Sequence, residues 1–176
     1  GIAGSVSDLA FDGSGNLYAG GNFATAGGVT ANCVAKWDGT AWSALGTGMS
    51  STVYALAFDG SGNLYAGGYF TTAGGVSANR VAKWDGTAWS ALGTGIGGNF
   101  VYVLACDNAG NLYAGGLFTV AGGVTANYLA QWNGTAWSAL GSGCNSRVYT
   151  LSIDRNTLFA GGIFGTAGGK PSHSFA

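Results

Sequence analysis

The stretch Leu-Tyr-Ala-Gly-Gly at residues 17–21 occurs four times in this chain with a single change. It returns unchanged at 64–68 and 112–116, and as Leu-Phe-Ala-Gly-Gly at 158–162, at offsets of 47, 48 and 46 residues. Repeats of this length are typical of proteins in which each small structural unit is covered only by its neighbours. The sequence therefore predicts a tandem array of similar units rather than one domain with a unique core.

A second repeated block accompanies the first. The pattern Trp-Asp/Asn-Gly-Thr-Ala-Trp-Ser-Ala-Leu-Gly begins at Trp37, Trp84 and Trp132. Within the second unit, residues 53–58 alternate large and small side chains, which is the period of a β-strand. Gly- and Asx-rich segments separate the apolar runs and favour tight turns. The four strands expected in this unit are 53–58, 64–70, 81–84 and 89–92.

These features predict an all-β fold, a β-propeller of tandem four-stranded antiparallel blades with about 3.7 repeats. The expected units are residues 1–47, 48–94, 95–142 and an incomplete fourth unit at 143–176. The fourth unit lacks the Trp-Asp-Gly-Thr-Ala-Trp hairpin, and the first unit begins with its own first strand. An open array exposes sheet edges, so we expect a longer parent chain, a homo-oligomer or donated strands to complete it.

The order of the motifs resembles the kelch-type propeller blade. The pieces are Leu-Tyr-Ala-Gly-Gly at 64–68, Val-Ala-Lys-Trp-Asp at 81–85 and Trp89. The sequence also resembles secreted bacterial kelch-like repeats and the propeller repeats of fungal cortical-marker proteins. The resemblance covers nearly the whole chain and implies a propeller, but it implies little about the ligand because one fold serves many functions.

Composition restricts the partners. Only 7% of the residues are charged, Lys and Arg number 6 against 7 acidic residues, and the net charge is −1. Such a chain offers no basic face for phosphates, so we expect no nucleic-acid partner. No apolar run is long enough for a membrane helix, so we expect no membrane insertion. The low charge and the resemblance together favour an extracellular or cell-surface location.

Few residues could support catalysis or bind a metal. His173 is the only histidine, whereas the kelch-like copper oxidases need paired His and Tyr ligands. The cysteines share no spacing, and the sequence does not decide whether any two form a disulfide. One Asp recurs after each first strand, which suggests either a repeated cation site or an Asx turn, and the turn is the simpler interpretation. We expect no catalytic residues, no metal site and no cofactor. The cysteines are Cys33, Cys106 and Cys144, and the recurring acids are Asp12, Asp59, Asp107 and Asp154.

The candidate ligand-binding residues are aromatic or variable between repeats. Exposed aromatic rings can stack on sugars, although a large buried ring also stabilises a core. Positions that differ between otherwise similar units suggest surface exposure, where partners bind. The candidates are Trp37, Trp84, Trp132, Tyr69, Arg80 and Tyr128.

The sequence thus predicts a non-enzymatic extracellular β-propeller that binds protein or glycan or builds a surface assembly. A purely structural, self-associating repeat that forms a ring or a fibre is the alternative. An enzyme of the kelch-like oxidase or glycosidase type is the least favoured, because no constellation of base, nucleophile and ligands is visible.

Overall fold

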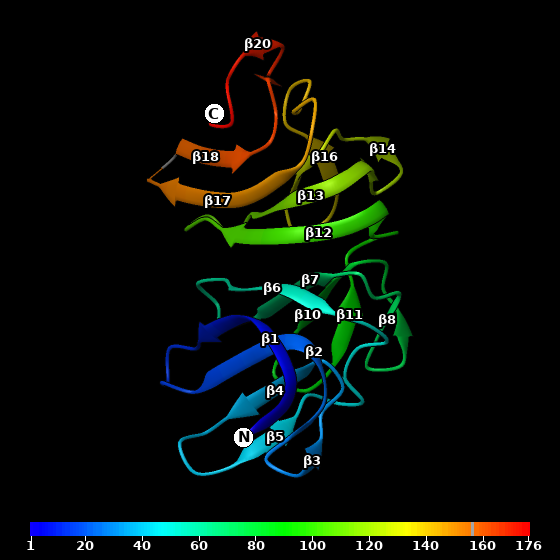
Figure 1. Cartoon of the computed structure of the whole chain (residues 1–176), viewed down its shortest axis with the longest axis vertical. Coiled ribbons are helices and arrows are strands. Elements are labelled where there is room, and N and C mark those ends of the chain that lie inside the picture. Colours follow the sequence, from blue (N-terminus) through cyan, green and yellow to red (C-terminus); the bar gives the residue numbers. More distant parts are fainter. Residues whose placement is uncertain (156) are drawn as a thin grey trace.

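The computed structural model describes residues 1–155 and 157–176, and these form strands and turns without a helix. Most of the strands build four antiparallel blade sheets that follow one another along the long axis of the molecule, and two short hairpins form separate two-stranded sheets (Figure 1). Each of the four blade sheets is one blade of a β-propeller, so the structure confirms the predicted all-β, antiparallel propeller fold. Among the described residues, no helix has the length and apolar character needed to cross a membrane.

The first three blades share one topology, in which the chain runs outward strand by strand. Blade 1 contains β1 (Ile2–Phe11), β2 (Leu17–Ala26), β4 (Val34–Trp37) and β5 (Trp42–Ala44), with β3 (Val29–Thr30) beside β2. Blade 2 contains β6 (Val53–Phe58), β7 (Leu64–Gly68), β10 (Val81–Trp84) and β11 (Trp89–Ala91), with the small hairpin β8 (Thr72–Ala73) and β9 (Val76–Ser77). Blade 3 contains β12 (Ile96–Cys106), β13 (Leu112–Ala121), β15 (Leu129–Trp132) and β16 (Trp137–Ala139), with β14 (Val124–Thr125) beside β13.

Blade 4 contains fewer strands. Its sheet pairs β17 (Val148–Asp154) with β18 (Thr157–Gly162), and a hairpin of β19 (Thr166–Ala167) and β20 (Lys170–Pro171) follows. Residues 174–176 hydrogen-bond to β18 through the backbone of Ala160 and Gly162. They therefore occupy the place that β15 takes beside β13 in blade 3.

Glycine allows neighbouring blades to approach closely. Gly67 of β7 faces the inner strand of blade 3, and a Cβ atom there would lie 2.6 Å from Val101 Cγ1 and 3.1 Å from Leu104 Cγ. Gly20 faces Val53 of blade 2 in the same way, at 2.6 Å. The second strand of a blade, which contains these glycines, therefore offers a flat surface. The apolar side chains of the next blade's inner strand pack on it.

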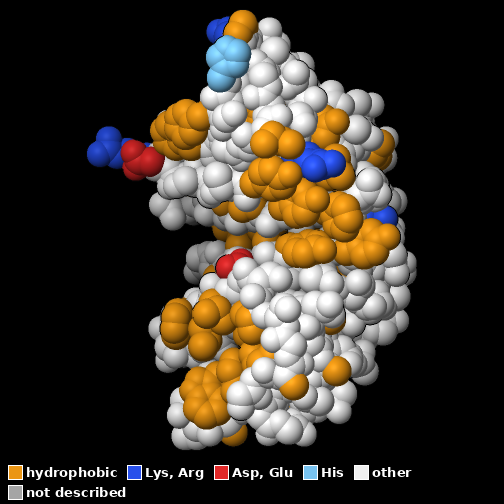
Figure 2. Space-filling model, viewed as in Figure 1, with side chains coloured by type: hydrophobic (Ala, Val, Ile, Leu, Met, Phe, Trp, Pro, Cys, Tyr) orange, Lys and Arg blue, Asp and Glu red, His pale blue; other side chains and the backbone are white. Residues whose placement is uncertain are grey.

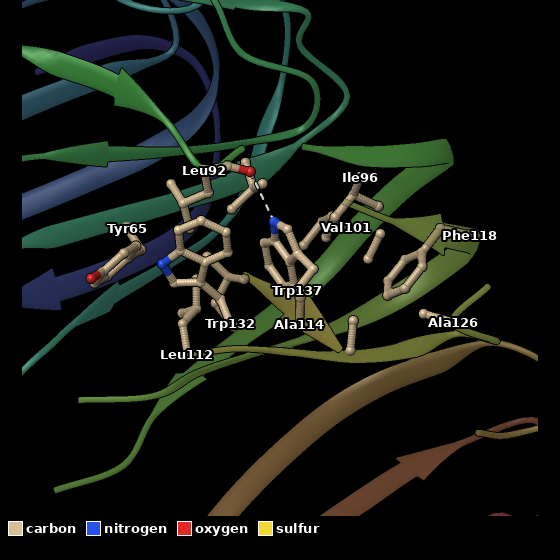
Figure 3. Packing of buried hydrophobic residues seen from close by; sticks show 14 of the residues in the cluster. Tyr65, Leu92, Ile96, Val101, Leu112, Ala114, Phe118, Ala126, Trp132 and Trp137 are labelled. Atoms are coloured by element: carbon tan, nitrogen blue, oxygen red, sulfur yellow. Dashed lines mark hydrogen bonds between the residues drawn. The ribbon is translucent and has the colours of Figure 1, made fainter. Parts of the chain in front are cut away.

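Tryptophan joins consecutive blades. Trp89 Nε1 donates a buried hydrogen bond to the Leu45 carbonyl of blade 1, and Trp137 Nε1 donates one to Leu92 of blade 2, both at 2.9 Å. Figure 3 shows Trp137 reaching Leu92, with Trp132 beside it. Each outer strand thus anchors its blade to the preceding one by both packing and hydrogen bonding.

A β-bulge recurs in the innermost strand of every blade. The register of β6 on β7 shifts between Val53 and Ala55, which leaves Tyr54 as the extra residue. The same shift leaves Ser7, Tyr102 and Tyr149 unpaired in the other three blades. Because a bulge re-aims its extra side chain, these residues do not follow the alternation of the strand.

Candidate functional site

Five aromatic rings from blades 2, 3 and 4 form one continuous cluster. The rings of Phe100 and Tyr102 stack at 5.4 Å between centroids with an interplanar angle of 16°. Tyr69 lies 5.0 Å from Phe100, and Tyr149 lies 5.3 Å from Tyr102. Tyr54 contacts both Phe100 and Tyr102, at 5.9 and 5.8 Å. The cluster therefore extends across two blade boundaries.

The bulges position this cluster. Tyr54, Tyr102 and Tyr149 are the extra residues of three consecutive bulges, so their side chains leave the blade interfaces and meet one another. Tyr69 follows the end of β7, and its backbone N–H is bonded to the Thr52 carbonyl. Tyr69 and Tyr149 are 46% and 44% exposed, which is high for rings of this size. Rings held in contact with one another while still open to solvent are available to a ligand.

Two arginines border the rings. Arg80 donates from Nε to the Asn99 carbonyl at 3.1 Å and from Nη1 to the Ile96 carbonyl at 3.3 Å. These bonds hold the guanidinium beside the first residues of β12, next to Phe100. Arg147 is exposed, and the nearby Tyr149 side chain raises the pKa of its guanidinium.

We call this group the aromatic–arginine surface. Figure 2 shows blue and orange side chains gathered over the middle of the molecule on the side of the inner strands. Burial raises the pKa of Tyr102, with Tyr149 adding to the effect and the positive charge of Arg147 opposing it. Tyr102 is thus a neutral hydrogen-bonding group at ordinary pH. The surface consists of Tyr54, Tyr69, Arg80, Phe100, Tyr102, Arg147 and Tyr149.

A strained backbone position lies next to this surface. Arg80 and Tyr128 have φ of 63°, as does Cys33, and the equivalent Ser174 has 66°. Non-glycine residues rarely adopt this left-handed conformation. The chain uses glycine at nearly all its other positive-φ positions, so the side chain at this position is retained despite the strain.

The structure places the predicted site residues in three different surroundings. Tyr69 and Arg80 belong to the aromatic–arginine surface, and Tyr128 is half-buried against the apolar cluster of blade 4. The predicted tryptophans lie elsewhere, at the outer end of each third strand, and each packs on the next tryptophan of its own blade at 5.3–5.6 Å. Trp132 is buried and Trp37 and Trp84 are half-buried, so core packing accounts for much of their surface.

Sequence reasoning missed most of the surface. Phe100, Arg147 and the three bulge tyrosines were not among the predicted residues. The available signal was a tyrosine at the same position of three successive repeats, Tyr54, Tyr102 and Tyr149. Strand alternation places such a residue between blades, and only the bulge removes it from there.

The recurring acids form Asx turns. Asp59 Oδ1 accepts from the backbone N–H groups of Ser61 and Asn63, and Oδ2 accepts from Asn63 Nδ2 and the Tyr65 hydroxyl. Burial raises the pKa of Asp59, but these hydrogen bonds outweigh it and hold the pKa below its usual range. Asp12 and Asp107 repeat this arrangement with Asn16 and Asn111.

The fourth recurring acid departs from the pattern, because Asp154 belongs to the ladder of β17 and β18, where it pairs with Thr157. Within the described residues, no group of three or more His, Cys, Asp or Glu side chains is arranged to hold a metal. Two hollows lie beside these turns, of about 480 Å³ between Asp12 and Asp59 and about 160 Å³ between Asp107 and Leu158. Their carboxylates are already engaged by the turns, so the Asx-turn interpretation explains these acids.

The remaining polar candidates lie apart from the surface. His173 is exposed in the loop after β20. The three cysteines are free thiols, so the structure contains no disulfide among its described residues. Burial, together with the charges of Asp59 and Asp107, raises the pKa of Cys106 to about 12. Burial also raises the pKa of Cys33 and Cys144, so all three are poor nucleophiles.

Comparison with known proteins supports the fold alone. No protein-family model and no curated protein matches the chain. Among solved structures, a similar chain is the extracellular domain of a protein described as a hybrid two-component system from B. thetaiotaomicron, with a TM-score of 0.51 and 14% identity. Another is the WD40 β-propeller domain of Doa1, with a TM-score of 0.44 and 13% identity.

The present chain is short relative to both. The matches cover 90% and 92% of this chain, but only 25% of the first protein and 63% of the second. The kelch-type assignment therefore remains a resemblance in sequence. The features of this chain that bear on its function are those of its own surface.

Proposed function

We propose that this chain is a non-enzymatic binding module of an extracellular or cell-surface protein, and that its ligand is a glycan or a protein. The observation that carries the proposal is the ring cluster of the aromatic–arginine surface, which joins three blades. Large, rigid, partly exposed rings supply contact area at low entropic cost, and tyrosine and arginine are enriched where proteins bind partners.

The proposed location has its own support. The low density of charge suits a secreted or surface setting, and one protein of similar fold is an extracellular domain. The absence of catalysis is part of the same proposal. The hydroxyl and guanidinium groups of the surface bind and orient, and none of them is paired with a base that would activate it.

The binding function can be tested on a printed array of glycans, with the Tyr102→Ala variant as the perturbed protein. Tyr102 contacts three other rings, so its removal should disrupt the cluster and lower the signal at least tenfold. Val124→Ala is the matched control, because Val124 is exposed on a hairpin outside the surface. Equal signals from Tyr102→Ala and the wild type, with both folded by circular dichroism, would exclude this surface as the glycan site.

A second candidate function, structural self-association, rests on a different observation. The inner strand of blade 1 exposes Leu9 by 55% and Phe11 by 67%, whereas the equivalent Leu56 of blade 2 is 6% exposed. In blade 2 this position packs on Gly20 of the preceding blade. Another blade of the same repeat would therefore pack on this face. Either a second copy of the chain or a longer parent chain could provide that blade.

Sedimentation velocity tests self-association directly. If copies stack through this face, the wild type should show a mass above that of the monomer that rises with concentration. Leu9→Asp should then abolish the association, whereas Val124→Asp, which adds the same charge on another exposed apolar residue, should not. A monomer at every concentration would exclude self-association and leave this face to a blade of a longer chain.

A further inference from the structure

The side-chain carboxylates gather at one end of the blades. In a sheet whose strands follow one another, the turns after the first and third strands lie at the same end, and the other connections lie at the opposite end. The chain has no Glu, and six of its seven Asp residues lie in or beside those first and third turns. They are Asp12, Asp38, Asp59, Asp85, Asp107 and Asp154.

The opposite end carries positive charge without side-chain carboxylates. Arg80 precedes the third strand of blade 2, Arg147 precedes the inner strand of blade 4, and Lys170 lies in the hairpin of blade 4. In Figure 2 the red side chains in view lie toward the left, where a blue side chain lies beside them, and the blue side chains within the orange group lie to the right. The two arginines of the aromatic–arginine surface therefore lie at the end of the blades that carries no side-chain carboxylate.

The remaining acid is Asp8, within the inner strand of blade 1. Its Oδ1 accepts from its neighbour Leu9 N at 2.9 Å, and its Oδ2 accepts from Leu56 N of blade 2 at 2.7 Å. Both oxygens are thus engaged by backbone, and blade 1 contributes no ring to the aromatic cluster. Asp8 does not neutralise Arg80 or Arg147.

We propose that the aromatic–arginine surface binds an acidic saccharide, with the sugar faces on the rings and a carboxylate at the guanidinium groups. This inference rests on the proposed binding function and narrows it. A sugar presents a C–H face that packs on an aromatic ring, and hydroxyl groups that pair with the tyrosine hydroxyls at the ring edges.

The arginines account for the acidic part of the ligand. Guanidinium is a planar fork that matches a carboxylate, and a charge-assisted pair of this kind is stronger than a neutral hydrogen bond. Arg80 is already oriented by two backbone carbonyls, and its other N–H groups remain for a ligand. Because the guanidinium is already held in place, binding orders less of the side chain and its entropic cost is lower.

The left-handed conformation supports the same assignment. At the position shared by Arg80 and Tyr128, a glycine would relieve the strain, yet the chain places there a long cation in blade 2 and a large ring in blade 3. Both side chains reach the inner strand of the next blade, Arg80 at Asn99 of β12 and Tyr128 at the apolar cluster that contains Val148 of β17. The strained position thus holds Arg80 at the boundary between blades 2 and 3, where its guanidinium belongs to the aromatic–arginine surface.

Isothermal titration with a matched panel of oligosaccharides tests the inference. The probes are galacturonate tetramers, the same tetramers with methyl-esterified carboxyl groups, sialylated and glucuronate-containing oligosaccharides with their neutral counterparts, and an oligo-aspartate peptide. We expect at least one acidic saccharide to bind tenfold or more tightly than its uncharged counterpart, with affinity that falls as salt is added.

Three arginine variants distinguish binding by the arginines of this surface from a general effect of positive charge. Arg80→Ala with Arg147→Ala should remove the preference for the acidic form, a loss of tenfold or more, because a hydrogen bond to a charged group is lost. Arg155→Ala is the matched control, since Arg155 lies at the acidic end beside Asp154, and it should leave affinity unchanged. The three arginine side chains are exposed or half-exposed, so the variants should keep their fold, and circular dichroism checks this.

The possible failures have distinct meanings. Equal binding of acidic and uncharged saccharides, or an equal loss in Arg155→Ala, would overturn the acidic-saccharide inference while leaving the binding function intact. Tighter binding of oligo-aspartate than of every saccharide would overturn it in favour of an acidic protein. If no glycan on the printed array binds either, the glycan form of the proposed function fails as well.

Discussion

Replacing Trp89 by Phe should weaken the contact between blades 1 and 2. The substitution removes the hydrogen bond from Nε1 to the Leu45 carbonyl, which is 2.9 Å long and buried. That carbonyl also accepts from Gly48 N at 3.2 Å, so it keeps one partner and the loss is about 1 kcal/mol. The smaller ring buries two fewer carbons, which costs about 1.5 kcal/mol more. We expect the free energy of unfolding to fall by about 2–3 kcal/mol.

The assay is equilibrium unfolding in urea followed by far-UV circular dichroism, which does not depend on the removed fluorophore. With an m-value near ~2 kcal/mol/M, the midpoint should fall by about 1–1.5 M. Trp42→Phe is the matched control, because Trp42 occupies the same place in blade 1, where the described chain places no blade before it. Trp42→Phe should shift the midpoint by less than about 0.5 M.

Two results would refute this reasoning. One is an equal destabilisation by Trp42→Phe and Trp89→Phe, which would show that the cost comes from within the blade. The other is a neutral Trp89→Phe, which would show that the bond across the blade boundary contributes nothing to stability. An unchanged m-value in both variants is needed for either comparison.

Three further predictions concern packing, charge and thiol chemistry. Gly67→Ala places a methyl group against the inner strand of the next blade and should lower stability by about 1–3 kcal/mol and Tm by several degrees, whereas Gly60→Ala, with nothing near its Cβ position, should leave Tm unchanged. Hydrogen bonds from Ala88 and Thr87 lower the pKa of Asp85 from 3.8 to about 2, so its contribution to stability is full above the unfolded value and is lost as pH falls toward the folded one. Asp85→Asn, which copies Asn133 of blade 3, should therefore flatten the acid side of a plot of Tm against pH, and an unchanged slope would contradict this. With its pKa raised to about 12, Cys106 should react slowly with Ellman's reagent in the native protein at pH ~8 and quickly after unfolding, and fast native labelling would show that the thiol is not protected.

The elements that could be predicted from the sequence are those fixed by residues close together in the chain. The expected strands 53–58 and 81–84 match β6 and β10, because turn residues and alternation act over a few positions. The expected strand at 64–70 extends past the end of β7 at Gly68, and Tyr69 is instead turned toward the surface. The Asx turns were predicted from spacing alone, since a carboxylate bonds to backbone only two to four residues away.

By itself, the sequence determined the repeat, the strand order, the tight turns and the low density of charge. Only the tertiary structure decided which repeated residues face a ligand. The tyrosines of three inner strands look like interface residues in the alternation. A bulge in each strand turns them out, so that they meet Phe100 and rings of the neighbouring blades. The physical reason is that a bulge is a property of two paired strands and the cluster is a property of three stacked blades, and neither can be read from neighbouring positions along one chain.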